Sequence, residues 1–229
     1  MVIGGLQKFS LADFPGLISA IVFTRGCGFR CPYCHNPELV DPPRYADEIP
    51  MAELDDFLRS RTGKLHGVVV TGGEPTVHED LPAFLGRLKD LGYEVKLDTN
   101  GTNPRMLQGV LTDRLVDFVA MDIKAPPALY EQTVNAPVKV EDILYSIELI
   151  RGSGLPHEFR TTWVPALLTE IDIRAIAQLV KGCDCYILQP FRPGKMLDSS
   201  LEGRPPRDDA QIGGIVEAAT AAGFQITLR

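Results

Sequence analysis

The stretch TRGCGFRCPYCHN (residues 24–36) gathers three cysteines, Cys27, Cys31 and Cys34, on one short segment. Their Cys-x3-Cys-x2-Cys spacing lets one loop wrap a face of a cube-shaped cluster, with each sulfur binding a different iron. Soft thiolate ligands favour iron–sulfur clusters, zinc or copper(I). The chain has five cysteines, and such crowding in a reducing compartment indicates a metal site rather than a disulfide framework.

The run before these cysteines is the first of several short apolar segments of strand length. Strands are predicted at ISAIVF (18–23), GVVVT (67–71), YEVKLD (93–98), VDFVAMD (116–122), EFRTTWV (158–164), CYILQPF (185–191) and FQITL (224–228). Helices are predicted between them at 51–61, 81–92, 140–154, 171–182 and 208–223. Alternating strands and helices form parallel βαβ units. About six units fit this length, whereas a complete barrel needs about 250 residues. We therefore predict an α/β fold, an incomplete (β/α)6 barrel of TIM type, as one domain over residues 1–229.

Two other metal sites could use the same cysteines. His35 could complete a zinc site, although closed zinc sites usually take two ligand pairs separated by a longer loop. A simple electron-transfer cluster needs four cysteines, and Cys183 or Cys185 could supply the fourth. Both lie before or within the strand at 185–191, towards the end of the barrel away from the cysteine loop. We therefore expect them to be buried structural thiols.

A glycine-rich turn follows the second predicted strand, at Gly72, Gly73, Glu74 and Pro75. Two glycines allow the backbone to approach a ligand closely, and Glu74 could accept a hydrogen bond from a ligand ammonium group. Taken alone, the four residues could equally be an ordinary turn. In parallel α/β folds the chemistry gathers at the carboxyl ends of the strands, so this turn is expected to lie beside the cysteine loop.

Polar side chains also end the following strands. They are Asp98, Thr99 and Asn100 in LDTNG, Asp122 and Lys124 in MDIK, and Gln189, Phe191 and Arg192 in ILQPFRPGK. Some of these residues suit turns, and Asn103 before Pro104 suits a helix N-cap. The charges of Asp98, Asp122 and Lys124 need either mutual pairing or a ligand. Gln189, Phe191 and Arg192 are candidates for lining a ligand pocket or a substrate entrance.

Composition excludes several classes of function. The net charge of −7 disfavours unaided binding to a nucleic-acid backbone or to an anionic membrane surface. No run of about 18 apolar residues is present, and the first residues lack the pattern of a secretory signal. We expect a cytoplasmic protein that binds neither nucleic acid nor membrane.

Cys27, Cys31 and Cys34, with Tyr33 just before the third cysteine, resemble the signature of radical S-adenosylmethionine enzymes. The resemblance implies a [4Fe-4S] cluster held by the three cysteines, with one iron left for the amino and carboxylate groups of S-adenosylmethionine. Reductive cleavage would then give a 5′-deoxyadenosyl radical. Gly72, Gly73, Glu74 and Pro75 resemble the family motif that binds the methionyl amino group, and the implied fold is the incomplete barrel of this family.

LDTNG and MDIK further resemble the activating enzymes of glycyl radical enzymes. This resemblance implies that Asp98 and Asp122 help frame the S-adenosylmethionine site, with a monovalent cation in some members, and that Lys124 lies close to it. Thr99, Asn100 and Gln189 are further candidate residues for binding S-adenosylmethionine. The opening segment, residues 3–40, is similar to the anaerobic ribonucleoside-triphosphate reductase activating proteins. The implied partners are a glycyl radical enzyme, namely anaerobic ribonucleotide reductase, and an electron donor such as ferredoxin or flavodoxin.

Two alternatives to a glycyl radical activating enzyme stay open at this point. One is a radical S-adenosylmethionine enzyme with a small-molecule substrate, similar to 7-carboxy-7-deazaguanine synthase. The other is an iron–sulfur electron carrier without catalytic activity.

Overall fold

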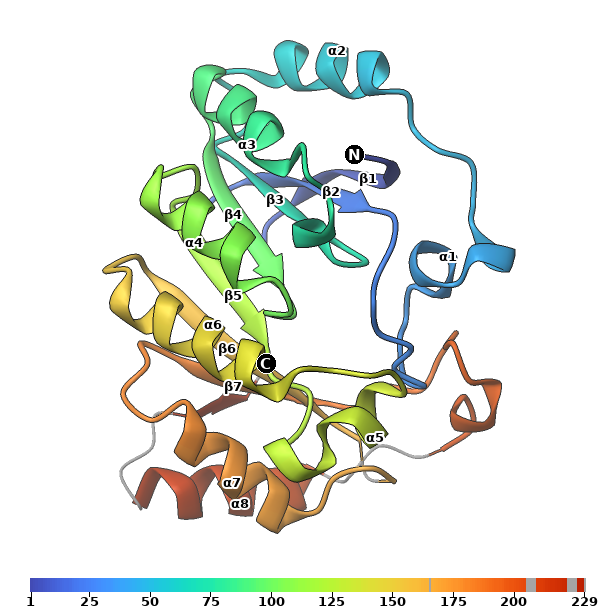
Figure 1. The fold of residues 1–229 in the computed structure, drawn as a ribbon, viewed down its shortest axis with the longest axis vertical. Coiled ribbons are helices and arrows are strands. Elements are labelled where there is room, and N and C mark those ends of the chain that lie inside the picture. Colours follow the sequence, from blue (N-terminus) through green and yellow to red (C-terminus); the bar gives the residue numbers. More distant parts are fainter. Residues whose placement is uncertain (165, 205–208, 222–225, 229) are drawn as a thin grey trace.

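The structure, a computed structural model, describes residues 1–164, 166–204, 209–221 and 226–228. Its centre is a curved eight-stranded sheet in which the strands follow chain order, so β1 and β8 lie at the two edges (Figure 1). Strands β2 to β8 are parallel to their neighbours, and β1 is antiparallel to β2. The strands are β1 (Ile3–Ser10), β2 (Ser19–Thr24), β3 (Gly67–Gly72), β4 (Glu94–Thr99), β5 (Phe118–Asp122), β6 (His157–Trp163), β7 (Tyr186–Pro190) and β8 (Ile226–Leu228). The sheet is thus an open barrel.

Helices cover the outside of the curved sheet (Figure 1). The longer ones are α2 (Met51–Arg61), α3 (Leu81–Asp90), α4 (Pro104–Thr112), α6 (Val140–Gly152), α7 (Glu170–Leu179) and α8 (Asp209–Ala221). Two short α-helices, α1 (Pro37–Val40) and α5 (Tyr130–Val134), and short 3-10 turns at Pro42–Arg44, Pro75–Val77, Pro127–Leu129 and Ser199–Leu201 lie in the connections. Each of β2 to β7 is followed by one of the six longer helices, which confirms the predicted incomplete (β/α)6 barrel.

Local sequence explains why these elements form where they do. Val68, Val69 and Val70 of β3 are at most 1% exposed, as expected of a strand covered on both faces. Asn103 accepts a hydrogen bond from the backbone N–H of Met106 at 3.1 Å, so the predicted N-cap is confirmed. These caps and apolar runs fix the helix and strand boundaries that bring the strand ends together.

Some elements were not predicted. β1 (IGGLQKFS) has two glycines and three polar residues and lies at a sheet edge, so it lacks an apolar run. α4 was missed apart from its N-cap. The last predicted strand is described only as Ile226–Leu228, and the remainder of FQITL lies outside the described residues.

Among the described residues, no helix is both long and apolar enough to span a membrane.

Residues 191–201, which we call the post-β7 segment, return from the end of β7 to the cysteine loop (Figure 1). The backbone N–H of Leu197 donates to the carbonyl of Cys34 at 3.0 Å, and that of Asp198 donates to the carbonyl of Pro32 at 2.9 Å. Met196 is 1% exposed, so the segment is also packed into the core. The second half of the cysteine loop is therefore supported by residues far along the chain.

Candidate active site

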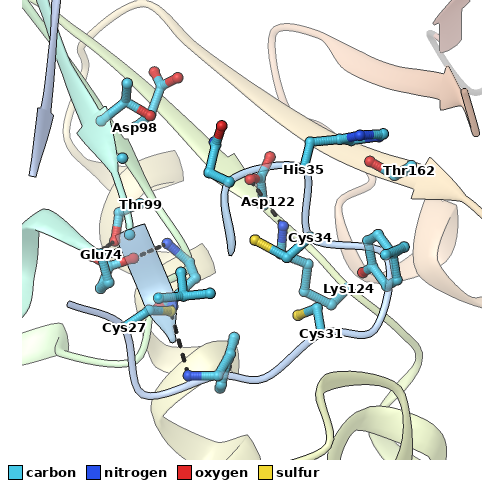
Figure 2. Close-up of a pocket in the computed structure, with 18 of the residues that line it drawn as sticks. Cys27, Cys31, Cys34, His35, Glu74, Asp98, Thr99, Asp122, Lys124 and Thr162 are labelled. Atoms are coloured by element: carbon cyan, nitrogen blue, oxygen red, sulfur yellow. Dashed lines mark hydrogen bonds and ion pairs between the residues drawn. The ribbon is translucent and has the colours of Figure 1, made fainter. Parts of the chain in front are cut away.

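A cavity of about 320 Å³ opens at the carboxyl ends of the parallel strands. Most of the predicted site residues line it (Figure 2). They are Cys27, Cys31, Tyr33, Cys34, Gly72, Gly73, Glu74, Asp98, Thr99, Asn100, Asp122, Lys124 and Gln189. Pro75 is not among the lining residues; it is buried at the start of a 3-10 turn. Residues that follow the carboxyl ends of strands β2 to β7 therefore line one cavity, as the parallel topology predicts.

The three clustered cysteines come from the loop after β2, and their sulfurs face the same space (Figure 2). All three are free thiols. Burial raises the pKa of Cys27 to about 12 and that of Cys31 to about 11, and it also raises the pKa of Cys34. Thiols at such sites ionise when a metal binds, so metal loading would release protons.

The three sulfurs do not converge on one point in the structure. Among the described residues, no group of three or more His, Cys, Asp or Glu side chains is arranged to hold one metal ion. A cluster needs no such convergence, because each thiolate binds a different iron. His35, the residue that would complete a zinc site, lines the cavity and is exposed.

Tyr33 offers a second indication that a ligand belongs in this cavity. Its side chain is 4% exposed, and among the described residues its hydroxyl has no hydrogen-bond partner. Buried hydroxyls are normally hydrogen-bonded, so a bound group is the natural partner for this one.

Cys183 and Cys185 lie at the opposite end of β7 from the cavity. Cys185 directly precedes this strand, Tyr186–Pro190, and the lining residue Gln189 is its fourth residue, so the two are separated by about 13 Å of extended chain. Neither cysteine lines the cavity, so the geometry does not support a fourth ligand from this pair. The expectation that both are buried was wrong, because each is only half-buried in the segment just before β7.

Glu74 is held inside the wall of the cavity, with 1% of its surface exposed. Its Oε1 accepts hydrogen bonds from the backbone and hydroxyl of Thr76, at 3.1 and 2.6 Å, and from the hydroxyl of Thr99 at 2.7 Å. Its Oε2 accepts from the backbone N–H of Asn100 at 2.6 Å. Burial raises the pKa of Glu74, although these four hydrogen bonds favour the charged form. Glu74 thus ties the loop after β3 to the end of β4.

The glycines of the same loop lie against the backbone of the cysteine loop. Gly72 has a φ of 119°, and a Cβ there would lie 2.4 Å from the backbone of Thr24. Gly73 donates its N–H to the carbonyl of Thr24 at 2.8 Å, and Glu74 donates to the carbonyl of Gly26 at 2.7 Å. The two motifs that the sequence singled out are therefore one connected structure.

Charged side chains form a row of alternating sign across the ends of β4, β5 and β6. Asp98 Oδ1 lies 3.1 Å from Lys96 Nζ, and Asp98 Oδ2 lies 3.0 Å from Arg160 Nη1. Asp122 Oδ1 lies 2.8 Å from Arg160 Nε, and Asp122 Oδ2 lies 3.0 Å from Lys124 Nζ. Each of the four carboxylate oxygens thus contacts a cationic group. The pairing expected for Asp98, Asp122 and Lys124 is present, but Lys96 and Arg160 supply most of it.

This row fixes the charge states at the cavity. Burial alone would raise the pKa of Asp122, but Arg160 and Lys124 outweigh it and hold that pKa well below the usual range. Burial alone would lower the pKa of Lys124, but Asp122 and other acidic groups raise it. Asp122 is therefore ionised and Lys124 protonated at neutral pH. A monovalent cation at Asp98 and Asp122 stays a prediction, and it would have to displace one of these side chains.

Several lining residues were not predicted as site residues. They are Phe29, Asn36, Val40, Thr71, Arg160 and Thr162, besides His35. Arg160 and Thr162 occupy alternate positions of β6, and that period of two was the available signal. Phe191 and Arg192, predicted candidates, do not line the cavity: Phe191 is buried in the core and Arg192 is exposed.

Comparisons with known proteins agree with this geometry. The chain is 34% identical over 210 residues to a Methanocaldococcus jannaschii protein named "Putative glycyl-radical enzyme activating enzyme", covering 89% of this chain and 85% of that one. It is 26% identical over 201 residues to the 7-carboxy-7-deazaguanine synthase of Thermococcus kodakarensis, covering 79% of this chain and 78% of that one.

Among solved structures, Streptococcus suis SuiB bound to S-adenosylmethionine superimposes with a TM-score of 0.70. The match covers 91% of this chain at 13% identity, which shows a shared fold. It spans only about half of the longer SuiB chain, 51% of its length.

The family model of the radical SAM superfamily matches residues 21–180, a stretch that carries the cysteine loop and the polar ends of β3 to β6. This chain therefore belongs to the radical SAM superfamily, and it is an enzyme of the kind that uses a [4Fe-4S] cluster and S-adenosylmethionine.

Proposed function

We propose that this chain is an activating enzyme that installs a glycyl radical on a partner enzyme. The observation that carries the proposal is the 34% identity, over 89% of the chain, to a protein named as such an activating enzyme. The cavity supports the proposal, because its lining residues come from the cysteine loop, the Gly72–Gly73–Glu74 turn, LDTNG and MDIK, which are the motifs that resemble those of activating enzymes.

We further propose roles for the residues of the cavity. Cys27, Cys31 and Cys34 would hold the cluster, and the backbone of Gly72 and Gly73 would lie against S-adenosylmethionine. When bound, these two groups supply one electron and a 5′-deoxyadenosyl radical, which takes a hydrogen atom from a glycine Cα and leaves the unpaired electron there.

The protein's own contribution would be positioning and charge. Glu74, through Thr76, Thr99 and Asn100, keeps the loop after β3 rigid. Lys124, held by Asp122, presents a permanent positive charge beside the cysteines, where it offsets the negative charge of thiolates. Burial of the lining residues limits the water that reaches them.

The proposed client is an anaerobic ribonucleoside-triphosphate reductase, supported by the likeness of residues 3–40 to the activators of that enzyme. A low-potential one-electron carrier such as ferredoxin or flavodoxin would supply the electron. Chain 1–229 would act as one domain in this reaction.

The test uses the anaerobically reconstituted chain, reduced with dithionite, with S-adenosylmethionine and a purified anaerobic reductase. We expect 5′-deoxyadenosine to form and an electron paramagnetic resonance signal of a glycyl radical to appear on the reductase. A reductase with its radical glycine changed to alanine is the matched control and should give no signal. S-adenosylmethionine cleavage without any radical on the intact reductase would contradict this client.

A second candidate is a small-molecule enzyme similar to 7-carboxy-7-deazaguanine synthase, favoured by the 26% identity over 79% of the chain. Incubation of the loaded, reduced chain with the substrate of that synthase distinguishes the two. Conversion of that substrate, with no glycyl radical on the reductase, would favour the second candidate.

A further inference from the structure

Asn100 lies where the end of β4 meets the cysteine loop, and its side chain contacts a cysteine sulfur. Its Nδ2 is 3.8 Å from Cys27 Sγ, within hydrogen-bond range for sulfur. The residue is 6% exposed, so water competes little for this amide.

The orientation of the Asn100 amide is fixed by its other end. Oδ1 accepts two hydrogen bonds from Thr102, one from the backbone N–H at 3.0 Å and one from the hydroxyl at 2.7 Å. The backbone N–H can only donate, so the end that faces Thr102 is the oxygen and the end that faces Cys27 is the NH2 group. The backbone of Asn100 is held as well, by Glu74 Oε2 at 2.6 Å. A flip of the amide would place the NH2 group against the backbone N–H of Thr102 and break that hydrogen bond.

Cys27 Sγ has a second donor, the backbone N–H of Phe29 at 3.3 Å. Hydrogen bonds to ligand sulfurs stabilise the more electron-rich, reduced form of an iron–sulfur cluster and so raise its reduction potential. The Phe29 contact belongs to the backbone and would exist with many sequences. The Asn100 contact depends on one side chain.

We propose that Asn100 tunes the reduction potential of the cluster by donating a hydrogen bond to Cys27, with Thr102 holding the amide in the donating orientation. This inference rests on the proposed function in one respect, that Cys27 is a cluster ligand. In the step concerned, one electron passes from a low-potential one-electron donor to the oxidised cluster. No covalent bond of the protein breaks and no proton is transferred. Asn100 acts through Cys27 and is a positioning and tuning residue.

The experiment is a redox titration of the full-length, anaerobically reconstituted chain, followed by electron paramagnetic resonance of the reduced cluster. Asn100→Asp keeps the shape and the acceptor for Thr102 but removes the NH2 donor. We expect its reduced-to-oxidised ratio at a given solution potential to fall about tenfold, which for one electron is a potential lower by about 59 mV.

A second variant separates the lost donor from the added charge. Asn100→Leu is uncharged and similar in size, and it should lower the potential in the same direction. Asn103→Asp is the matched control: it adds the same charge three residues away and can still cap α4, but the native Asn103 amide donates to the carbonyl of Thr76 rather than to sulfur. Its reduced-to-oxidised ratio should change less than threefold. Thr102→Ser, which keeps the hydroxyl, should leave the ratio unchanged.

Iron and sulfide content are measured on every variant, so that a misfolded protein is recognised. An unchanged potential in both Asn100 variants, at full cluster content, would overturn the proposal. So would a shift in Asn100→Asp that Asn100→Leu lacks, because charge alone would then explain it. Absence of a cluster on the unsubstituted chain would instead remove the proposed function and this inference with it. A cluster that shifts as expected but activates no reductase would count against the proposed function alone.

Discussion

The backbones of Gly73 and Gly26 are in direct contact, because a Cβ at position 73 would lie 2.1 Å from the carbonyl oxygen of Gly26. That same oxygen accepts the backbone hydrogen bond from Glu74 at 2.7 Å. The cysteine loop and the loop after β3 are therefore fitted to each other with no room for a side chain. We therefore expect a change in either loop to displace the other.

Gly73→Ala should force the two loops apart, because no flexible side chain can move to make room. We expect it to lower the free energy of unfolding by about 1–3 kcal/mol, the usual cost of an overpacked site. Cluster content after reconstitution should fall with it. Urea unfolding and iron analysis measure the two effects.

The control for this change is Gly109→Ala. Gly109 is in helix α4 and its Cβ would meet nothing within 4 Å. Alanine is favoured over glycine inside a helix by about 0.5–1 kcal/mol, so this variant should be slightly more stable than the parent. Equal stability of the Gly73 and Gly109 variants would show that the close contact is not rigid.

Single alanine substitutions of Cys27, Cys31 and Cys34 should each abolish a stable [4Fe-4S] cluster and the cleavage of S-adenosylmethionine. Cys183→Ala and Cys185→Ala should retain full iron content, because these cysteines lie at the far end of β7. Iron and sulfide per chain are measured after anaerobic reconstitution. Lower iron in either of the last two variants would revive the four-cysteine alternative.

Glu74→Gln should weaken S-adenosylmethionine binding more than it weakens cluster assembly. An amide group would face some of the four donors that surround the carboxylate, at a cost of about 1–3 kcal/mol in folding stability. The three cysteines are left in place, so iron content should change little. Equilibrium binding to the loaded chain and urea unfolding test this. The same change at Glu79, an exposed residue of the same loop, should have no effect on either measurement.

Asp122→Asn should change how stability depends on pH. The folded pKa of Asp122 is depressed, mainly because Arg160 and Lys124 outweigh the effect of burial. A depressed carboxyl stabilises the fold fully above its unfolded pKa of about 3.9, and the contribution is lost as the pH falls below that value. Urea unfolding of the metal-free protein is measured between pH 5 and 3. As the pH falls, the free energy of unfolding of the parent should decrease more steeply than that of the asparagine variant, by up to about 1.4 kcal/mol per pH unit. Parallel curves would contradict a depressed pKa.

The sequence carried enough information to predict the barrel, because its parallel strands are buried on both faces and appear as continuous apolar runs. Val68, Val69 and Val70 are an example. β1 could not be found in this way, since an edge strand needs no apolar run and owes its place to pairing with β2.

The sequence was enough to predict which residues lie at the strand ends, but not which side chains from neighbouring strands contact each other there. Spacing gave the three cysteines, and strand topology gave Asp98 and Asp122. Which cations pair with them depends on neighbouring strands: Arg160 reaches both aspartates only because β4, β5 and β6 are adjacent. The surroundings of Glu74 were missed for a similar reason, because its donors come partly from the end of β4.

The post-β7 segment also has a consequence for biosynthesis. Cys34 receives its backbone partner from Leu197, and the numbers of these residues differ by 163 (197 − 34 = 163). Ribosomes add about 5–20 residues per second, so roughly 8–30 s pass between the synthesis of the third cysteine and of the segment that supports its loop. During that interval the cysteines belong to an unfinished loop. Delivery of iron and sulfide to this protein is therefore expected to follow translation rather than accompany it.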